Sequence, residues 1–162
     1  MAIKIICKKN LKEKPNWYLL EQLLTEEMRL LTLIEHPHIV RTLGLASTEE
    51  SIYVAFELIS SGNLLEFLKQ IKQKHISFTE ADAANLVKQI LLAIAYLHSP
   101  DVNVIHRDLK LENIMVDIEK ESDGKSKIVC KVTDFGFSVA MDPSGKQTLA
   151  LGTPTYMAPE IV

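Results

Sequence analysis

The chain has 162 residues, of which 47% are hydrophobic and 24% charged, and its formal net charge is −3. This length and apolar content suffice for one sizeable core, which argues against a largely disordered protein. The lysines are scattered along the chain rather than clustered, so the charge pattern argues against a nucleic-acid partner.

The amino-acid sequence lacks the features typical of secreted and membrane proteins. No apolar run approaches the length of a membrane span, and Met1 leads directly into a strand-like run instead of a leader peptide. Cys7 and Cys130 show neither metal-ligand spacing nor a disulfide framework, so we expect buried free thiols. We therefore expect a cytoplasmic protein without a membrane span.

The first two predicted elements carry a lysine and a glutamate in unusual settings. Residues 2–6 are a β-branched run that predicts a strand, interrupted by Lys4. Residues 8–14 predict a loop, and Asn16 is a suitable N-cap for a helix that ends near residue 34. Glu27 falls within the apolar stripe of this helix, where burying an unpaired charge is costly. We expect Glu27 to be paired or to face a site; a solvated Lys4 and a surface Glu27 are the alternatives.

Two strands and two helices are predicted next. Residues 38–46 and 52–58 are typical of strands joined by a polar turn. Asn63 and Thr79 are each followed three residues later by an acidic residue, which is the form of a capping box. They predict helices that end near residues 73 and 98 and serve as scaffold.

Residues 104–116 place three polar side chains at fixed spacing between two apolar runs. Asp108 offers a carboxylate that can orient a hydroxyl and accept its proton. Lys110 lies on the same side of an extended chain, where it can neutralise charge on a phosphate. Asn113 offers a neutral oxygen that suits Mg²⁺. The pattern indicates a phosphoryl-transfer loop; the alternative is a polar loop between two buried strands.

A further candidate metal ligand follows the next pair of predicted strands. Residues 113–116 and 128–132 predict strands, and the charged tract 117–127 predicts a solvated hairpin loop between them. Asp134-Phe135-Gly136 follows the second strand, and Asp134 supplies an anionic oxygen ligand. Taken alone, this triplet is compatible with any transition from strand to turn.

Three strings together resemble the eukaryotic protein kinases. His106-Arg107-Asp108-Leu109-Lys110-Leu111-Glu112-Asn113 fits their catalytic loop, Asp134-Phe135-Gly136 their metal-binding triplet, and residues 152–160 the G-T-P-x-Y-x-A-P-E end of their activation segment. Within this family the sequence is similar to the serine/threonine kinases, most of all to the calcium/calmodulin-dependent protein kinase group. The resemblance implies an α+β, bilobal, truncated fold, with the small lobe and hinge over residues 1–59 and the start of the large lobe over residues 60–162.

The resemblance also implies roles for individual residues. Lys4, in an A-I-K strand, would hold the α- and β-phosphates of ATP and pair with Glu27. Asp108 and Lys110 would act on the acceptor hydroxyl and the transferred phosphate, and Thr153 would bond to both. Asn113 and Asp134 would hold Mg²⁺. The implied adenine contacts are Ala2, Phe56, Glu57, Ile59 and Met115.

The implied function is an ATP-dependent protein serine/threonine kinase. Its partners would be a protein substrate with a Ser or Thr acceptor and an upstream activating kinase. Leu149 occupies the usual phosphosite of the family, so we expect phosphorylation at Thr148 or Ser144, with Arg107 available to pair with the phosphate.

Departures from the family pattern leave other functions open. The glycine-rich hairpin and the later large-lobe helices of the family have no counterpart here, so we expect a partial domain, and Thr42 replaces an apolar residue. A non-catalytic pseudokinase or scaffold is therefore the main alternative. A small-molecule kinase is disfavoured, because segments such as residues 152–160 position a peptide.

Overall fold

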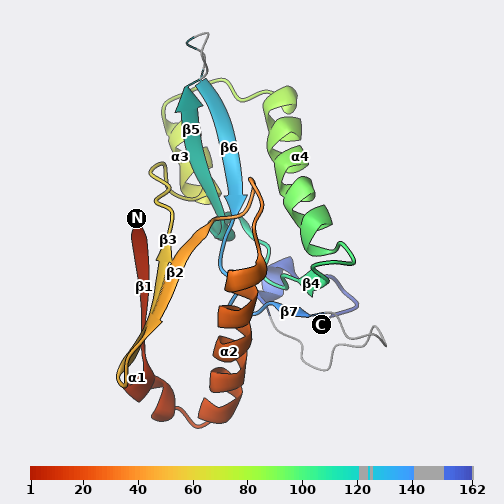
Figure 1. Ribbon diagram of the computed structural model, residues 1–162. Helices are drawn as coiled ribbons and strands as arrows, with labels where there is room; N and C mark the ends of the chain where they lie inside the picture. The colour runs from red at the N-terminus through yellow and green to blue at the C-terminus, as the bar shows by residue number, and fades with distance from the viewer. Residues whose placement is uncertain (121–123, 125, 141–151, 162) are drawn as a thin grey trace.

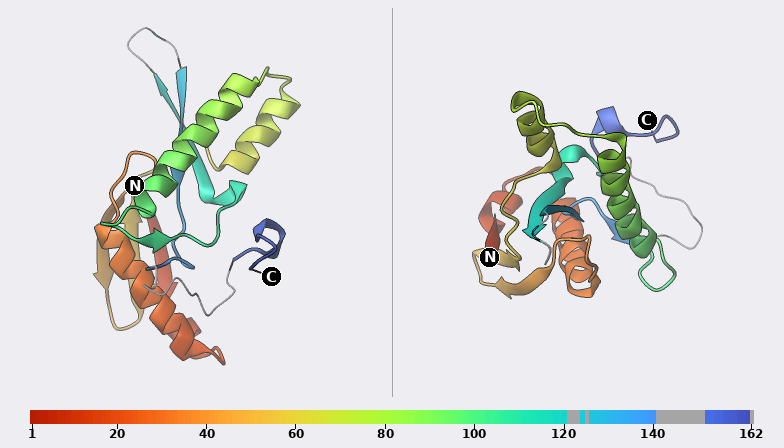
Figure 2. Two further views of the ribbon diagram at one scale, coloured as in Figure 1. Left: turned by 90° about the vertical axis from the view of Figure 1, so that its right-hand side faces the viewer. Right: turned by 90° about the horizontal axis from the view of Figure 1, so that it is seen from above.

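The computed structural model describes residues 1–120, 124, 126–140 and 152–161, and it consists of two parts (Figure 1). The small lobe holds a three-stranded antiparallel sheet in the order β1-β3-β2, with helix α2 packed beside it. The second part holds helices α3 and α4 and a long hairpin of strands β5 and β6. Figure 2, left, shows both helices on the same side of this hairpin.

The small lobe begins with β1 (Ala2–Cys7), which pairs with β3 (Ser51–Phe56); β2 (Thr42–Ser47) pairs with the other edge of β3. Side chains alternate between the two faces of a strand, and in β1 this leaves Ile3 and Ile5 exposed while Lys4 lies on the opposite face. Thr42, the departure noted in the sequence, is half-buried opposite Phe56.

Helix α2 (Trp17–Leu33) confirms the predicted amphipathic helix. Glu27 is buried in its apolar stripe together with Leu30 and Leu31. Asn16 occupies the N-cap position, although its side chain makes no capping hydrogen bond. The predicted loop before it is wrong in part, because residues 8–12 form helix α1 (Lys8–Lys12). Lysine and leucine favour helices, and Lys9 and Lys12 suit the negative end of the helix dipole.

The predicted strand over residues 38–46 starts four residues too early. Its first part leaves the small sheet and pairs with β6 (Ser126–Val132) instead. Val132 donates its backbone N–H to the carbonyl oxygen of His38, and the N–H of Val40 donates to the carbonyl oxygen of Val132. This crossing ties the small lobe to the strand that leads to Asp134.

Helices α3 (Leu64–Gln73) and α4 (Glu80–Leu97) confirm the two capping predictions. The side chain of Asn63 accepts a hydrogen bond from the N–H of Glu66, and Thr79 forms a complete capping box with Asp82. Gln89 of α4 is buried and exchanges hydrogen bonds with β6 through the N–H of Cys130 and the carbonyl oxygen of Ile128. These bonds fix α4 against the hairpin.

The hairpin strands run farther than predicted, because much of the charged tract is strand. β5 (Ile114–Lys120) pairs with β6 in a register that ends at Lys120 and Ser126. Ile118 lies opposite Ile128, and Glu119 opposite Lys127, so apolar and oppositely charged cross-strand pairs support the extension. The remaining elements are β4 (Val104–Ile105), which pairs with β7 (Val139–Ala140), and the 3₁₀ turns η1 (Leu111–Asn113) and η2 (Pro154–Tyr156).

The buried core runs through both parts. It includes Leu30 of α2, Val54 of β3, Leu97 of α4, Val132 of β6 and Phe135. Within the described residues, no helix is long and apolar enough to cross a membrane.

The two cysteines are free thiols in different surroundings, which predicts different reactivity. Cys130 is 1% exposed, and burial raises its pKa to about 11, whereas Cys7 is half-buried at the end of β1. Because the thiolate is the nucleophile, we expect iodoacetamide at pH 8 to modify Cys7 of the folded chain and to spare Cys130. Peptide mass mapping, with guanidinium-unfolded chain as the control in which both react, checks this. Equal labelling of both thiols in the folded chain would contradict the described packing.

Candidate active site

Strand β1 and helix α2 bring Lys4 and Glu27 together. The Nζ atom of Lys4 lies 2.6 Å from Oε1 of Glu27 and 3.9 Å from Oδ1 of Asp134. Glu27 is 5% exposed, so Lys4 supplies the counter-charge that its buried carboxylate requires. The sequence alternatives of a solvated lysine and a surface glutamate are therefore excluded. Lys4 stands between two carboxylates, where a cation can also meet an anionic ligand.

The loop between β4 and β5 holds Asp108 at the centre of a hydrogen-bond network. Lys110 Nζ donates to Asp108 Oδ2 over 2.7 Å, and the side chain of Asn113 donates to the same oxygen over 2.9 Å. Thr153, from the far segment, donates its hydroxyl to Asp108 Oδ1 over 2.6 Å and accepts a bond from Lys110 over 2.8 Å. Four of the predicted catalytic residues therefore meet in one network.

This network keeps Asp108 ionised. Burial alone raises the pKa of its carboxyl, but the hydrogen bonds from Lys110, Thr153 and Asn113 outweigh burial and hold the pKa below its ordinary value. The same contact with Asp108 raises the pKa of Lys110. A carboxylate has about four lone-pair sites, and Lys110, Asn113 and Thr153 take three of them. As far as the described residues go, Oδ1 keeps one acceptor site for a further hydroxyl.

A buried histidine supports the backbone of this loop. His106 is 1% exposed and packs its ring edge-on against Phe135, with centroids 5.1 Å apart. Its Nε2 lies 3.1 Å from the carbonyl oxygen of Thr133, and its Nδ1 lies 3.3 Å from the N–H of Asp108. Burial lowers the pKa of His106, which suits a neutral ring that donates through Nε2 and accepts through Nδ1. His106 therefore joins the loop to the strand before Asp134.

Asn113 is bonded to the residue that directly precedes Asp134. The N–H of Thr133 donates to the backbone carbonyl oxygen of Asn113, and Ile114 pairs with Val132 in the adjoining hairpin. Within the described part of the chain, the Asn113 side chain bonds through its amide nitrogen, and its oxygen Oδ1 has no partner there. One carboxylate and one amide oxygen form a donor set that suits Mg²⁺ bound together with phosphates.

The backbone is strained at two positions of this site, in the loop that holds Asp108 and at Asp134. Arg107 and Asp134 each have φ of 66°, a left-handed conformation that non-glycine residues rarely adopt. Arg107 donates from Nε to the carbonyl oxygen of Phe137, and Ser138 donates to the carbonyl oxygen of His106. These bonds hold the strained loop against the segment after the triplet. Strain of this kind persists only where surrounding contacts enforce it.

Comparison of the sequence with known proteins shows the family of this chain. The profile of the protein kinase domain matches residues 1–162. The chain belongs to the protein kinase domain family. It is 41% identical to a calcium/calmodulin-dependent protein kinase type 1 of Macrobrachium nipponense over 162 residues, which are 100% of this chain and 42% of the relative.

Two relatives from Dictyostelium discoideum also match over nearly the whole of this chain. The chain is 39% identical to the probable serine/threonine-protein kinase fhkD and 37% identical to myosin light chain kinase A, each over 99% of this chain. It spans 20% and 49% of these two proteins, so it covers less than half of any of the three. The predicted resemblance to serine/threonine kinases of the calcium/calmodulin-dependent group is confirmed, as is the α+β kinase fold; the division at residues 59 and 60 stays a prediction.

A pocket of about 280 Å³ lies between the two parts of this kinase domain. Its lining is Lys4, Glu27, Leu31, Val40, Phe56, Thr133, Asp134 and Phe135. Among the predicted adenine contacts, Phe56 lines this pocket, and Ala2 is its register partner across the sheet. The other two predicted contacts are not among the lining residues. Ile59 is buried, and Met115 forms a β-bridge with Asn63.

One of the two backbone groups of Glu57 is already bonded within the protein, and the role of Glu57 at adenine stays a prediction. Its N–H donates to the carbonyl oxygen of Arg41 over 3.0 Å, so its own carbonyl oxygen is the backbone group that it can offer to adenine. Its side chain contacts Lys131, a residue that the sequence analysis did not single out. The alternation of side chains along β6 could have drawn attention to Lys131. It places this lysine on the face opposite the buried Cys130 and Val132.

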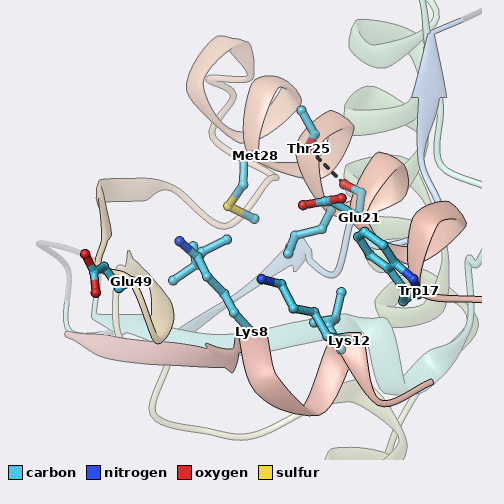
Figure 3. Close-up of a pocket in the computed structure, with 10 residues that line it drawn as sticks. Lys8, Lys12, Trp17, Glu21, Thr25, Met28 and Glu49 are labelled. Atoms are coloured by element: carbon cyan, nitrogen blue, oxygen red, sulfur yellow. Dashed lines mark hydrogen bonds between the residues drawn. The ribbon is translucent and has the colours of Figure 1, made fainter.

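A second and larger pocket, of about 500 Å³, lies on the other face of α2 (Figure 3). Figure 3 shows Lys8 and Lys12 extending from α1 toward α2, with Met28 opposite them. Trp17, Thr25 and Met28 line this pocket, whereas Glu27 and Leu31 line the pocket with Lys4. None of the predicted site residues belongs to the larger pocket.

Gly152 is a point of close contact in the kinase site, and we expect alanine there to be destabilising. Its φ is 134°, and an added Cβ would lie 2.4 Å from the backbone oxygen of Arg107. Gly152→Ala must therefore shift the segment that carries Thr153, and the chain should lose about 1–3 kcal/mol of stability. Thermal unfolding measures this loss. Gly44→Ala is the matched control, because an added Cβ there meets no atom within 4 Å; equal melting temperatures for both variants would contradict the described contact.

Proposed function

We propose that this chain is the catalytic part of an ATP-dependent protein serine/threonine kinase, which transfers the γ-phosphate of ATP to a Ser or Thr hydroxyl of a protein. The observation that carries the proposal is the network around Asp108, in which Lys110, Asn113 and Thr153 converge on one ionised carboxylate. A network that served structure alone would not need to leave an acceptor site on Oδ1 beside a lysine.

In this proposal Asp108 orients the acceptor hydroxyl. Its lowered pKa makes it a weak base, so it positions the hydroxyl throughout the reaction and takes the proton late, as a loose phosphoryl-transfer transition state allows. Lys110, 2.7 Å from Asp108 Oδ2, places a positive charge beside that hydroxyl, where it can stabilise charge on the transferred group. Thr153 holds the activation segment against both residues.

Lys4 holds the phosphates of ATP at the other end of the site. Glu27 fixes the ammonium group of Lys4 at 2.6 Å, which limits its motion and leaves its remaining donors free for phosphate oxygens. Asn113 Oδ1 and the carboxylate of Asp134 would hold Mg²⁺, which supplies positive charge to the phosphates when bound. Phe56 and the carbonyl oxygen of Glu57 would face the adenine.

A partner-binding module without catalysis is the second candidate. It is the main alternative because the chain spans less than half of each of the three relatives named above. The described site opposes this candidate, because Lys4, Asp108, Asn113 and Asp134 keep the residue types that the chemistry requires. A small-molecule kinase is disfavoured by the contact of Thr153 with Asp108, which brings the peptide-positioning segment into the site.

Regulation and location belong to the proposal as well. An upstream kinase would phosphorylate Thr148 or Ser144, which lie outside the described residues. Arg107 would receive that phosphate by charge-assisted hydrogen bonds. We further propose that the protein acts in the cytoplasm.

The identity of the acceptor tests the proposal. The natural polypeptide is incubated with Mg²⁺ and ATP labelled in the γ-phosphate, together with a generic protein acceptor or with small alcohols and sugars. The proposal predicts label in phosphoserine or phosphothreonine of the protein after acid hydrolysis. Label in small molecules alone would support the small-molecule kinase, and binding of protein partners without any label transfer would support the scaffold.

A further inference from the structure

An ion pair links the start of the hinge to the strand that leads to Asp134. Nζ of Lys131 lies 2.7 Å from Oε1 of Glu57 and 2.8 Å from Oε2, so it spans both oxygens of the carboxylate. Glu57 Oε1 also accepts the backbone N–H of Arg41 over 2.8 Å. The two residues are 74 positions apart in sequence. We name this pair, Glu57 with Lys131, the hinge bridge.

The Glu57 end of the bridge is bonded to Arg41, the residue that precedes β2. Arg41 and Glu57 exchange two hydrogen bonds, from the N–H of Glu57 to the carbonyl oxygen of Arg41 and from the N–H of Arg41 to the Glu57 side chain. This exchange continues the antiparallel pairing of β2 and β3 by one residue at the hinge end. The position of the Glu57 carbonyl, which faces adenine in the proposed function, is therefore tied to its own side chain.

The Lys131 end belongs to the strand that positions the phosphate site. Lys131 precedes Val132, which pairs with residues 38–40, and Thr133, whose N–H donates to Asn113. Asp134 follows directly. Lys131 itself pairs with Met115 across the hairpin. Lys131 thus lies three residues before Asp134, one proposed metal ligand, and beside β5, which begins directly after Asn113, the other.

The bridge differs from an ordinary surface ion pair. The side chains of Lys131 and Glu57 are 16% and 21% exposed, whereas Arg29 in the pair with Glu26 is 51% exposed and joins residues of one helix turn. Exposed pairs contribute little because water and salt screen them. Burial raises the pKa of Glu57, but bonds from Lys131 and Arg41 outweigh it and keep the carboxyl ionised.

Lys131 does not reach the phosphates by itself. It lines a separate hollow of about 300 Å³ with Glu35, His36, Pro37, Arg41 and Glu57, while Lys4 and Asp134 line the pocket between the two parts. Any effect of Lys131 on nucleotide must therefore pass through Glu57 and through β6.

We propose that the hinge bridge is a positioning device that fixes the adenine edge of the hinge relative to the Asp134 end of the site. The inference rests on the proposed function and deepens it, by naming Lys131 and the Glu57 side chain as determinants of ATP affinity. When the bridge is intact, the adenine edge of the hinge and the Asp134 end of the site stand at the separation that ATP requires. When it is broken, part of the binding free energy is spent on restoring that separation.

The test compares Lys131→Met, which removes the charge and keeps most of the length, with Lys131→Arg, which keeps the charge. Arg29→Met is the matched control, because it breaks an ion pair of similar length that joins two residues of α2 alone. In the natural polypeptide we expect Lys131→Met to raise KM for ATP about fivefold with kcat within about twofold of the parent, and Lys131→Arg to restore most of this loss. Arg29→Met should leave KM unchanged.

A purely structural role would lower kcat through loss of folded protein and leave KM unchanged, and that result would overturn the inference. A fluorescent ATP analogue, titrated against the same variants, measures affinity without turnover. If the parent binds ATP but transfers no phosphate, the proposed function fails while a weaker affinity of Lys131→Met still supports the bridge. If the parent binds and transfers but Lys131→Met binds ATP equally well, the bridge alone is refuted; if the parent binds no ATP, both fail.

Discussion

Replacing Asp108 by asparagine is expected to lower phosphate transfer at least about 100-fold, because its carboxylate is the group proposed to orient the acceptor hydroxyl. The amide has nearly the same shape but no charge and fewer acceptor sites. Lys110, which lies 2.7 Å from this carboxylate, would lose its counter-charge at the same time. Initial rates of label transfer from ATP to a protein acceptor measure the change.

The matched control is Asp101→Asn, since Asp101 is an exposed residue in the turn between α4 and β4. The same chemical change there should leave the rate within about twofold of the parent, because surface substitutions away from a site have small effects. Circular dichroism of both variants separates a lost reaction from a lost fold. An Asp108→Asn variant that is folded and retains parental activity would remove Asp108 from the mechanism.

Replacing Lys4 by methionine is expected to lower transfer by about two orders of magnitude, because Lys4 provides the cation proposed for the phosphates. It should also destabilise the chain, because the 5% exposed Glu27 then keeps a buried charge without its partner. Lys4 is itself partly exposed, so a discounted cost of about 1–3 kcal/mol is expected. Transfer rates and chemical denaturation measure the two effects separately.

A double-mutant cycle sharpens this second prediction. Glu27→Gln added to Lys4→Met removes the unpaired charge, so the double variant should regain part of the lost stability while its activity stays low. Lys9→Met, at an exposed lysine of α1, is the control for the loss of one lysine. If Lys4→Met is both fully active and as stable as the parent, the pairing with Glu27 has neither of the assigned consequences.

Much of the site could be predicted because its residues stand in short, spaced strings. Asp108, Lys110 and Asn113 lie within six positions, so the local chemistry was apparent before any folding was considered. Glu27 was recognisable because a carboxylate inside an apolar stripe demands a partner, and the structure supplies Lys4 at 2.6 Å. The caps at Asn63 and Thr79 were equally local, which explains why α3 and α4 begin where expected.

Contacts that depend on tertiary structure could not be predicted in this way. The pairing of residues 38–40 with Val132 replaces an expected strand, because β-branched residues suit either sheet and the sequence does not encode the partner. The hairpin of β5 and β6 was underestimated, because the pairs that support its extension, such as Glu119 with Lys127, form across the strands rather than along the sequence. The hinge bridge joins Glu57 to Lys131 over 74 positions, beyond any local pattern.

The most direct test of the central claim is a side-by-side assay of the natural polypeptide and its Asp134→Asn variant. Both are given Mg²⁺, ATP labelled in the γ-phosphate and a generic protein acceptor, and phosphoserine and phosphothreonine are counted. The site described here predicts label from the parent and a loss of at least about 100-fold in the variant, because Asp134 is the proposed anionic ligand of Mg²⁺. Label transfer that is equal in both, or absent from a folded parent that binds ATP, would contradict the assignment of this site to protein phosphorylation.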